Sequence, residues 1–188
     1  MSNKLILAST SPRRRELLAL LNLPFEVVAS QADENITGDV AEVVEALAIR
    51  KAKAVQAMGS NTQNQQVILA ADTLVSIQGI ILEKPQNKDH AFEMLKQLQG
   101  RDHEVLTGVA ILQGEVCHSF VSTTKVFFRP MTDQEIWDYI ATGEPFDKAG
   151  GYGIQGLGAL FVERIEGDFY SVMGLPVSQV YQKLRLFI

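Results

Sequence analysis

The run Val67-Ile68-Leu69-Ala70-Ala71 is apolar at every position and is followed directly by Asp72. This pattern is typical of a strand with two buried faces, because neighbouring side chains point to opposite sides of a sheet. We therefore predict a central strand over residues 67–71 that Asp72 interrupts. The rest of the fold is built around this strand.

On the N-terminal side, strands and helices alternate. Residues 4–8 form a second apolar strand, Pro12 suits the first turn of a helix, and residues 25–29 form a third strand. Asp39 is suited to cap a long helix that runs through Met58. This order favours parallel strand–helix–strand units, whose ligands bind at the carboxyl ends of the strands.

On the C-terminal side, hairpins dominate. The sequence predicts a helix capped by Asn87, a hairpin of strands 105–112 and 116–128, a helix behind the capping box Thr132–Glu135, a turn at 166–168 between segments 160–165 and 169–173, and a last helix from Pro176. A mixed, twisted central sheet flanked by helices, which is an α/β fold, accommodates both halves.

Composition limits the functions that the chain can have. Its 188 residues are 46% hydrophobic and 21% charged, so we expect a single domain over residues 1–188. One cysteine, Cys117, precludes an internal disulfide and favours the cytoplasm. No apolar stretch approaches the roughly 20 residues that cross a bilayer. A net charge of −5 argues against broad binding to nucleic acid or anionic membranes, yet a local pocket for a small anion is compatible with it.

The first candidate for such a pocket is Ser9-Thr10-Ser11-Pro12-Arg13-Arg14-Arg15, where a strand meets a helix. Free backbone N–H groups and the helix dipole favour an anion there, whereas arginines oppose the dipole unless an anion is bound. A phosphate site explains this placement. The alternative is a helix capped by Ser11 with solvated arginines.

Asp72-Thr73 is the second candidate, because an acid lies inside an apolar run that resumes at Leu74. A buried carboxylate needs a cation, a metal or an exit to solvent. Asp72 is therefore a candidate metal ligand or general base, and the alternative is an aspartate that caps a bend. Lysines at 51, 53 and 84 could each meet phosphate as a point charge, although an exposed surface lysine is the commoner case.

The third candidate is a glycine-rich segment over residues 147–158. Gly151, Gly153 and Gly156 satisfy the dinucleotide-binding spacing, but the segment follows a helix and precedes a strand, which is the wrong order for that fold. We therefore reject a dinucleotide-binding dehydrogenase and predict a tight loop. Gln155 in this loop offers a donor and an acceptor that match the edge of a nucleobase.

These motifs together resemble the Maf family of nucleoside triphosphate pyrophosphatases, in its dTTP/UTP branch, over nearly the whole chain. The segments that carry the resemblance are Ser9-Thr10-Ser11-Pro12-Arg13-Arg14, Ala71-Asp72-Thr73, Glu83-Lys84-Pro85, Asp147-Lys148-Ala149-Gly150 and Gly153-Ile154-Gln155-Gly156. The resemblance implies an inosine-triphosphatase-like fold with two lobes around a cleft. It also implies cleavage between the α- and β-phosphates, which removes non-standard or excess nucleotides.

The same resemblance assigns roles to individual residues. Asp72 would accept the proton of the attacking water and, with Glu34, hold a divalent cation such as Mg²⁺ or Mn²⁺. The phosphates would be bound by Ser9, Ser11, Arg13, Arg14, Lys51 and Lys84, and the base would be selected by Thr73 and Gln155. One departure from the family pattern is Arg50, because the family often has glutamate before the helix lysine.

Three other outcomes stay open at this point. The substrate could be another or a modified nucleotide, or the chain could sense nucleotides as a regulator of cell division and septum formation. A scaffold with a solvated basic helix is the third alternative, and it predicts no stabilisation by nucleotide. A homodimer is a further expectation from the family resemblance.

Overall fold

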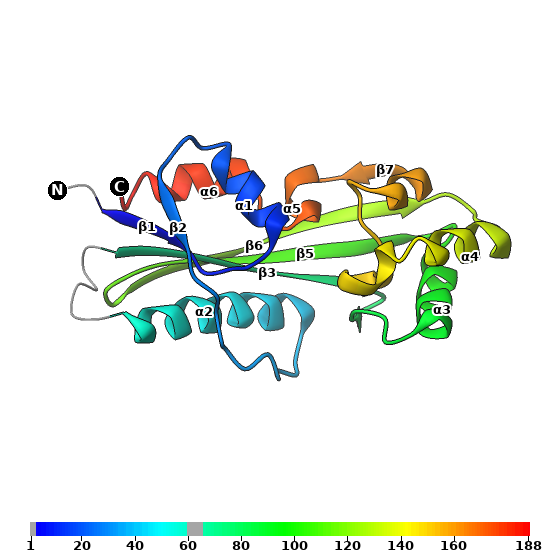
Figure 1. The fold of residues 1–188 in the computed structure, drawn as a ribbon, viewed down its shortest axis with the longest axis horizontal. Coiled ribbons are helices and arrows are strands. Elements are labelled where there is room, and N and C mark those ends of the chain that lie inside the picture. Colours follow the sequence, from blue (N-terminus) through cyan, green and yellow to red (C-terminus); the bar gives the residue numbers. More distant parts are fainter. Residues whose placement is uncertain (1–2, 60–65) are drawn as a thin grey trace. The chain divides into compact units, whose positions relative to one another are not determined.

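The computed structural model describes residues 3–59 and 66–188 (Figure 1). Its strands form one seven-stranded sheet in the order β2-β1-β3-β5-β6-β7, and β4 pairs with β3 off this path. The strands are β1 Lys4–Leu7, β2 Phe25–Val27, β3 Gln66–Ile77, β4 Ile80–Leu82, β5 Asp102–Gln113, β6 Val116–Phe128 and β7 Val162–Glu166. β1 is parallel to β2 and β3, whereas β4 and β7 are antiparallel to β3 and β6, so the predicted mixed α/β sheet is confirmed.

Helices connect most of these strands. The α-helices are α1 Pro12–Ala19, α2 Val40–Met58, α3 Lys88–Leu98, α4 Asp133–Ala141, α5 Phe169–Met173 and α6 Val177–Leu184. Three 3₁₀ helices, η2 Glu144–Asp147, η3 Ala149–Gly151 and η4 Leu157–Phe161, lie between α4 and β7.

Internal contacts divide the chain into two compact units. Unit 1 comprises Met1–Asp72, Thr107–Ser122 and Gly174–Ile188, and unit 2 comprises Thr73–Leu106 and Thr123–Met173. The strands β3, β5 and β6 each contribute residues to both units.

In unit 1, α2 covers one face of the sheet and α1 and α6 cover the other (Figure 1). Ala48, Ala52 and Val55 of α2 pack against apolar side chains of β1, β3 and β5. The helix approaches β5 so closely at Gly108 that an added Cβ would lie 2.3 Å from the carbonyl oxygen of Val44. This contact fixes α2, which carries Lys51, against the sheet.

In unit 2, α3 and α4 pack on the remaining parts of the strands. Leu95, Leu98, Ile136 and Ile140 of these helices share one buried cluster with strand residues such as Val126. Phe128 and Tyr152 meet edge to face within that cluster, with ring centroids 4.7 Å apart. The aromatic packing places the segment around Tyr152 directly on the core.

The helix caps predicted at Asp39 and Asn87 are present, and so is the cap at Ser11, which is part of the alternative interpretation of its segment. Asp39, Asn87 and Ser11 accept hydrogen bonds from the backbone N–H groups of Ala41, His90 and Arg14. Thr132 and Glu135 form the complete capping box of α4. Local sequence thus defines where these helices begin.

Two predictions about strands are wrong. Asp72 does not interrupt its strand, because β3 continues through Asp72 to Ile77 instead of ending at residue 71. The segment 169–173 is the helix α5 rather than a partner of the preceding strand. Asp168, which contributed to the predicted turn at 166–168, is a helix cap instead. Its carboxylate accepts a hydrogen bond from Tyr170 N at 2.9 Å at the start of α5.

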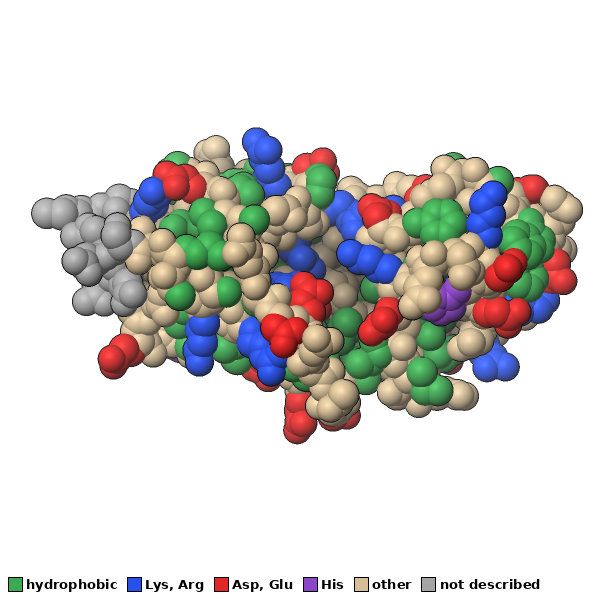
Figure 2. All heavy atoms as spheres, turned by 60° about the horizontal axis from the view of Figure 1, so that its bottom comes forward, with side chains coloured by type: hydrophobic (Ala, Val, Ile, Leu, Met, Phe, Trp, Pro, Cys, Tyr) green, Lys and Arg blue, Asp and Glu red, His purple; other side chains and the backbone are tan. Residues whose placement is uncertain are grey.

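The surface carries charges of both signs. On the face drawn in Figure 2, the described lysines and arginines are interspersed with acidic side chains rather than gathered in one broad field. None of the helices in the described part of the chain combines the length and the apolar character that a bilayer crossing requires.

Candidate functional site

The turn after β1 brings Ser9 and Ser11 together. Ala8 N donates to Leu69 O at 2.8 Å, so the pairing with β3 continues beyond β1. Ser9 is buried, and its Oγ accepts from Ser11 N at 3.2 Å, while Ser11 Oγ accepts from Arg14 N at 3.4 Å. Both hydroxyls therefore hold the turn that starts α1, and their contact with phosphate stays a prediction.

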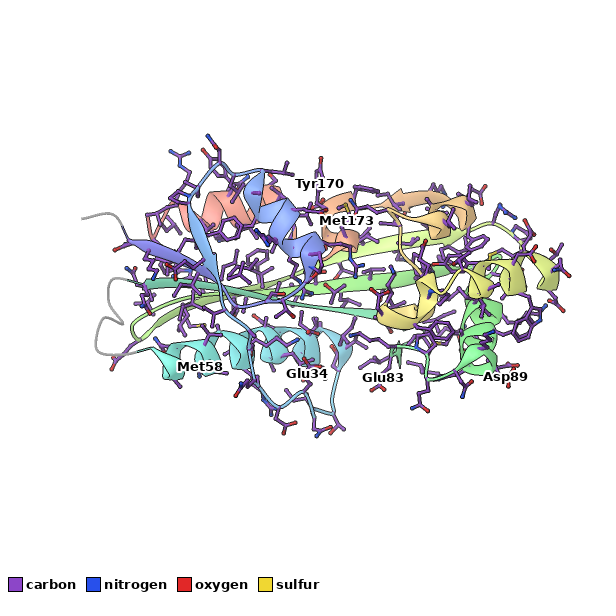
Figure 3. All side chains as sticks on the ribbon, in the orientation of Figure 1. Glu34, Met58, Glu83, Asp89, Tyr170 and Met173 are labelled. Carbon is purple, nitrogen blue, oxygen red and sulfur yellow. The ribbon has the colours of Figure 1, made fainter. Side chains whose placement is uncertain are left out.

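Lys51 on α2 is bound by two carboxylates. Its Nζ lies 2.5 Å from Asp72 Oδ1 and 2.8 Å from Glu34 Oε1. The side chains of Lys51 and Asp72 are 14% and 11% exposed, whereas Glu34 is 66% exposed on the loop beside α2 (Figure 3). Two of the predicted residues, Glu34 on a loop and Asp72 on a strand, thus converge on the ammonium group of a third, Lys51 on a helix.

Arg14 belongs to the same group of charges. Its Nε donates to Gly174 O at 2.8 Å, which ties α1 to the segment before α6. Burial lowers the pKa of its guanidinium, Asp72 and Glu34 raise it, and Arg13 lowers it. Because arginine stays protonated in proteins, Arg14 adds a fixed positive charge beside Asp72.

Arg50 holds the loop that carries Glu34. Its Nη1 donates to the carbonyl oxygens of Asp33 at 3.4 Å and Asn35 at 3.1 Å. These two residues flank Glu34, so consecutive basic residues of α2 engage the loop backbone and the loop carboxylate. The departure from the family pattern at Arg50 therefore coincides with a structural contact.

The lysine loop and the glycine loop lie together in unit 2. Gly150 N donates to the carbonyl oxygen of Glu83, which is labelled in Figure 3, at 3.1 Å. Lys84 follows Glu83 and is exposed. Gly150 has φ +69°, and an added Cβ would lie 2.8 Å from Val75 of β3. Only glycine adopts this conformation in so little space, which explains the residue at this position.

Thr73 and Gln155 also belong to unit 2, whereas the other candidates, Lys84 excepted, belong to unit 1. Thr73 is half-buried directly after Asp72 on β3. Gln155 is exposed at a turn in which Gly156 N donates to Gly153 O at 3.2 Å. The predicted tight loop is confirmed.

Sequence reasoning missed Glu144 and Tyr139. The Glu144 carboxylate accepts from Leu157 N at 2.9 Å and Gly158 N at 3.1 Å, and the Tyr139 hydroxyl donates to it at 2.9 Å. Neither residue belongs to a motif, and their hydrogen-bond partners lie up to 14 positions away. The one available signal was the glycine-rich segment over residues 149–158, because glycine allows a backbone to approach other groups closely.

Glu34 and Asp72 fit a divalent cation that is shared with a phosphate substrate. Mg²⁺ is usually held by one or two carboxylates together with substrate oxygens and water. The Lys51 ammonium already marks a place where two carboxylates gather around a positive charge. In residues 3–59 and 66–188 no group of three or more His, Cys, Asp or Glu is placed so that it could hold a metal ion.

Comparison with known proteins places the chain in a family. The family model described as Maf-like protein matches residues 4–187. The dTTP/UTP pyrophosphatase of Geobacillus sp. strain WCH70 is 51% identical over 184 residues, which are 97% of each chain. The Bacillus cytotoxicus protein of the same name is 50% identical over 186 residues, which are 98% of this chain and 95% of its own.

The solved structures are more distant. That of the Staphylococcus aureus Ham1 protein covers 66% of this chain and 71% of its own with 14% identity and a TM-score of 0.48, which is too low to support an inference. The family model and the relatives, in contrast, match almost the full length of the chain. This chain belongs to the Maf-like protein family.

Proposed function

We propose that this chain hydrolyses dTTP and UTP to the nucleoside monophosphate and pyrophosphate. The observation that carries the proposal is the cluster in which Lys51 bridges Asp72 and Glu34 at 2.5 and 2.8 Å beside the charged Arg14. Relatives named dTTP/UTP pyrophosphatase that are 51% and 50% identical over nearly their whole length support the choice of substrate.

In the proposed mechanism Asp72 accepts the proton of the attacking water. Its carboxylate is 11% exposed on the rigid strand β3, so it stays aimed in one direction. A positioned carboxylate of this kind contributes about 10²- to 10⁴-fold to a hydrolysis. Glu34 and Asp72 would hold a divalent cation, Mg²⁺ or Mn²⁺, which supplies charge neutralisation and a more acidic water when bound.

The basic side chains stabilise the departing pyrophosphate. Lys51 lies between two carboxylates and would direct its charge toward the substrate phosphates, together with Arg13 and Arg14. Phosphoryl transfer depends mainly on such positioning and electrostatics. We assign Lys84 to the same phosphates, with Ser9 and Ser11 shaping the turn that carries Arg13 and Arg14.

Thr73 and Gln155 select the base in this proposal. Gln155 is exposed at the tip of a tight turn, and its amide presents both a donor and an acceptor to a pyrimidine edge.

The cytoplasm is the compartment we propose, since the exposed thiol of Cys117 suits a reducing environment. Light scattering tests the homodimer that we also propose.

Product analysis tests the reaction. Purified protein with Mg²⁺ or Mn²⁺ is incubated with dTTP, UTP and a panel of other triphosphates, and the products are separated by ion exchange. We expect monophosphate and pyrophosphate from dTTP and UTP. Orthophosphate as the first product would place the cleavage elsewhere, and no turnover of either pyrimidine would refute the proposal.

A matched pair of variants identifies the catalytic carboxylate. Asp72→Asn keeps the size of the side chain and removes its basicity, so turnover should fall by about 10³-fold or more. Asp138→Asn is the control, because Asp138 is an exposed aspartate of α4 that contacts Gln134. Equal activity of the two variants would remove Asp72 from the mechanism.

A further inference from the structure

The carboxylate of Glu144 binds the backbone next to the turn that contains Gln155. Its Oε2 accepts from Leu157 N at 2.9 Å and its Oε1 accepts from Gly158 N at 3.1 Å. One carboxylate therefore holds two successive backbone amides directly after the turn. Hydrogen bonds to an ionised acceptor are about twice as strong as those between neutral groups.

Tyr139 of α4 holds the other side of the same turn. Its hydroxyl accepts from Gly153 N at 3.3 Å and donates to Glu144 Oε1 at 2.9 Å. Tyr139 is 4% exposed and packs edge to face on Phe161, so its position is set by the core of unit 2. The turn is thus attached to helix α4 before Gln155 and to Glu144 after it.

The glycines of this segment are explained by the same contacts. A Cβ at Gly156 would lie 2.5 Å from both carboxylate oxygens of Glu144, and one at Gly158 would lie 2.7 Å from Gly153 O. A Cβ at Gly153 would lie 2.6 Å from Lys148 Cε. Gly153 and Gly156 therefore lie where the backbone wraps around Lys148 and Glu144, whereas Gly151, the first glycine of the dinucleotide-like spacing, has φ +72° and lies against Pro85 and Pro145.

Lys148 completes the support. Its Nζ donates to Glu144 O at 2.9 Å and to Asp147 Oδ1 at 2.6 Å. Burial raises the pKa of Glu144, but the Leu157 and Gly158 amides, Tyr139 and Lys148 lower it by more, so the net pKa is below its ordinary value. The carboxylate is ionised at neutral pH and keeps both amide hydrogen bonds.

We propose that Glu144, together with Tyr139, positions the base-selecting loop, because Tyr139 fixes the backbone before Gln155 and Glu144 fixes it after Gln155. This inference rests on the proposed function, since it concerns how the pyrimidine is distinguished from other bases. Glu144 does not touch the nucleotide and acts through Gln155. A preorganised loop loses less conformational freedom when the base binds, which favours the matching base.

The test replaces Glu144 by its nearest isostere. Glu144→Gln places an NH₂ group or a weaker neutral acceptor against the two loop amides. We expect the KM for dTTP to rise about tenfold with kcat changed less than about threefold, and the preference for dTTP over dGTP to fall by a similar factor. Exposed Glu163 on β7 provides the control variant Glu163→Gln, which should leave both constants unchanged.

A double-mutant cycle separates positioning from general stability. Gln155→Ala alone should reduce the preference for pyrimidines, and Glu144→Gln added to it should reduce that preference no further. A merely structural role would instead lower kcat or the folded fraction equally for every nucleotide and in both backgrounds. Equal selectivity of Glu144→Gln and the wild-type protein would overturn the inference.

Amide hydrogen exchange provides a readout that does not need activity. Glu144→Gln should speed exchange at Leu157 and Gly158 and leave α3 unaffected. If Glu144→Gln does not fold, Tyr139→Phe removes one hydroxyl from the same network and should shift selectivity in the same direction by a smaller factor. If the wild-type protein does not cleave dTTP and UTP, the proposed function is wrong. If amide exchange at Leu157 and Gly158 is unchanged in Glu144→Gln, the proposal that Glu144 positions the loop is wrong.

Discussion

The ammonium group of Lys51 forms ion pairs with two carboxylates, which would repel each other without it. Asp72 and Glu34 both lie within 2.8 Å of its Nζ, and only Glu34 is well exposed. In Lys51→Met the two acids lose their shared cation, so the free energy of unfolding should fall by about 3 kcal/mol and kcat/KM by about 10²-fold. Urea unfolding and steady-state kinetics measure the two effects.

The same substitution should strengthen metal binding. Without the ammonium, Asp72 and Glu34 form a more negative pair, so Mn²⁺ should raise the melting temperature of Lys51→Met more than that of the wild-type protein. Lys53→Met is the control, because Lys53 is exposed two residues further along α2. A smaller shift in Lys51→Met would show that the metal does not use these carboxylates.

His103 makes stability depend on pH. It is 2% exposed, its Nε2 lies 2.7 Å from Tyr152 Oη, and its Nδ1 has no hydrogen-bond partner among the described residues. Burial lowers the pKa of His103 from 6.5 to about 4, and Asp102 opposes this shift. Between these values the unfolded chain binds a proton that the folded protein does not, so stability falls as the pH drops from 6.5 toward 4.

His103→Gln removes this titration. The shift corresponds to roughly 3 kcal/mol at most, so the variant should lose less stability than the wild-type protein between pH 7 and pH 4.5. Urea unfolding at several pH values gives the two slopes, and His118→Gln, at an exposed position, should retain the wild-type slope. Parallel slopes for His103→Gln and the wild-type protein would mean that His103 does not bind this proton.

The loop between β2 and α2 is ordered by the helix that follows it. Arg50 donates to the carbonyl oxygens on both sides of Glu34, at 3.4 and 3.1 Å. Arg50→Ala should therefore speed amide exchange at Asn35 and raise the Mg²⁺ concentration for half-maximal activity about tenfold, since groups behind a metal ligand commonly have this effect. Arg50→Lys should be intermediate, because lysine lacks the planar fork.

Exposed Arg101 provides a control for the loss of charge alone. Arg101→Ala should change neither the amide exchange of the loop nor the Mg²⁺ requirement. If Arg50→Ala behaves like Arg101→Ala in both measurements, Arg50 does not position Glu34.

Elements that local chemistry defines were predictable from the sequence. Asp39 marks the start of α2, and Thr132 with Glu135 marks that of α4, because a cap acts within four residues. The continuation of β3 through Asp72 was not predictable, since Lys51 neutralises the acid from 21 positions away. Asp168 was predicted to lie in a hairpin turn but caps α5. Aspartate is common both in turns and at helix caps, so the residue type does not distinguish the two.

The residues of the candidate site also fall into those that the sequence predicted and those that depend on contacts between distant parts of the chain. The interrupted apolar run pointed to Asp72 and the family resemblance to Lys51 and Glu34, and the structure places these three side chains in one group. Glu144 was missed because its partners are backbone amides, which no sequence pattern identifies. Arg50 was visible only as a departure from a pattern, and its contacts depend on how the loop folds back on α2.

The two compact units share three strands, and this bears on whether residues 1–188 behave as one domain. β3, β5 and β6 each pass from one unit to the other without a break in the strand. Unfolding one unit would leave half of each strand without its neighbours, so we expect a single cooperative transition. Trp137, the one tryptophan, reports on α4 in unit 2, and amide exchange of α2 reports on unit 1.

Both probes should give the same midpoint in a denaturant titration, and both midpoints should rise together when dTTP is added. A ligand at 100 times its Kd stabilises the folded state by about 2.7 kcal/mol if it binds that state alone. In a single cooperative domain this gain reaches α4 and α2 equally, wherever the nucleotide contacts the chain. Separate midpoints, or a shift at only one probe, would mean that the units unfold independently and that the single-domain prediction is wrong.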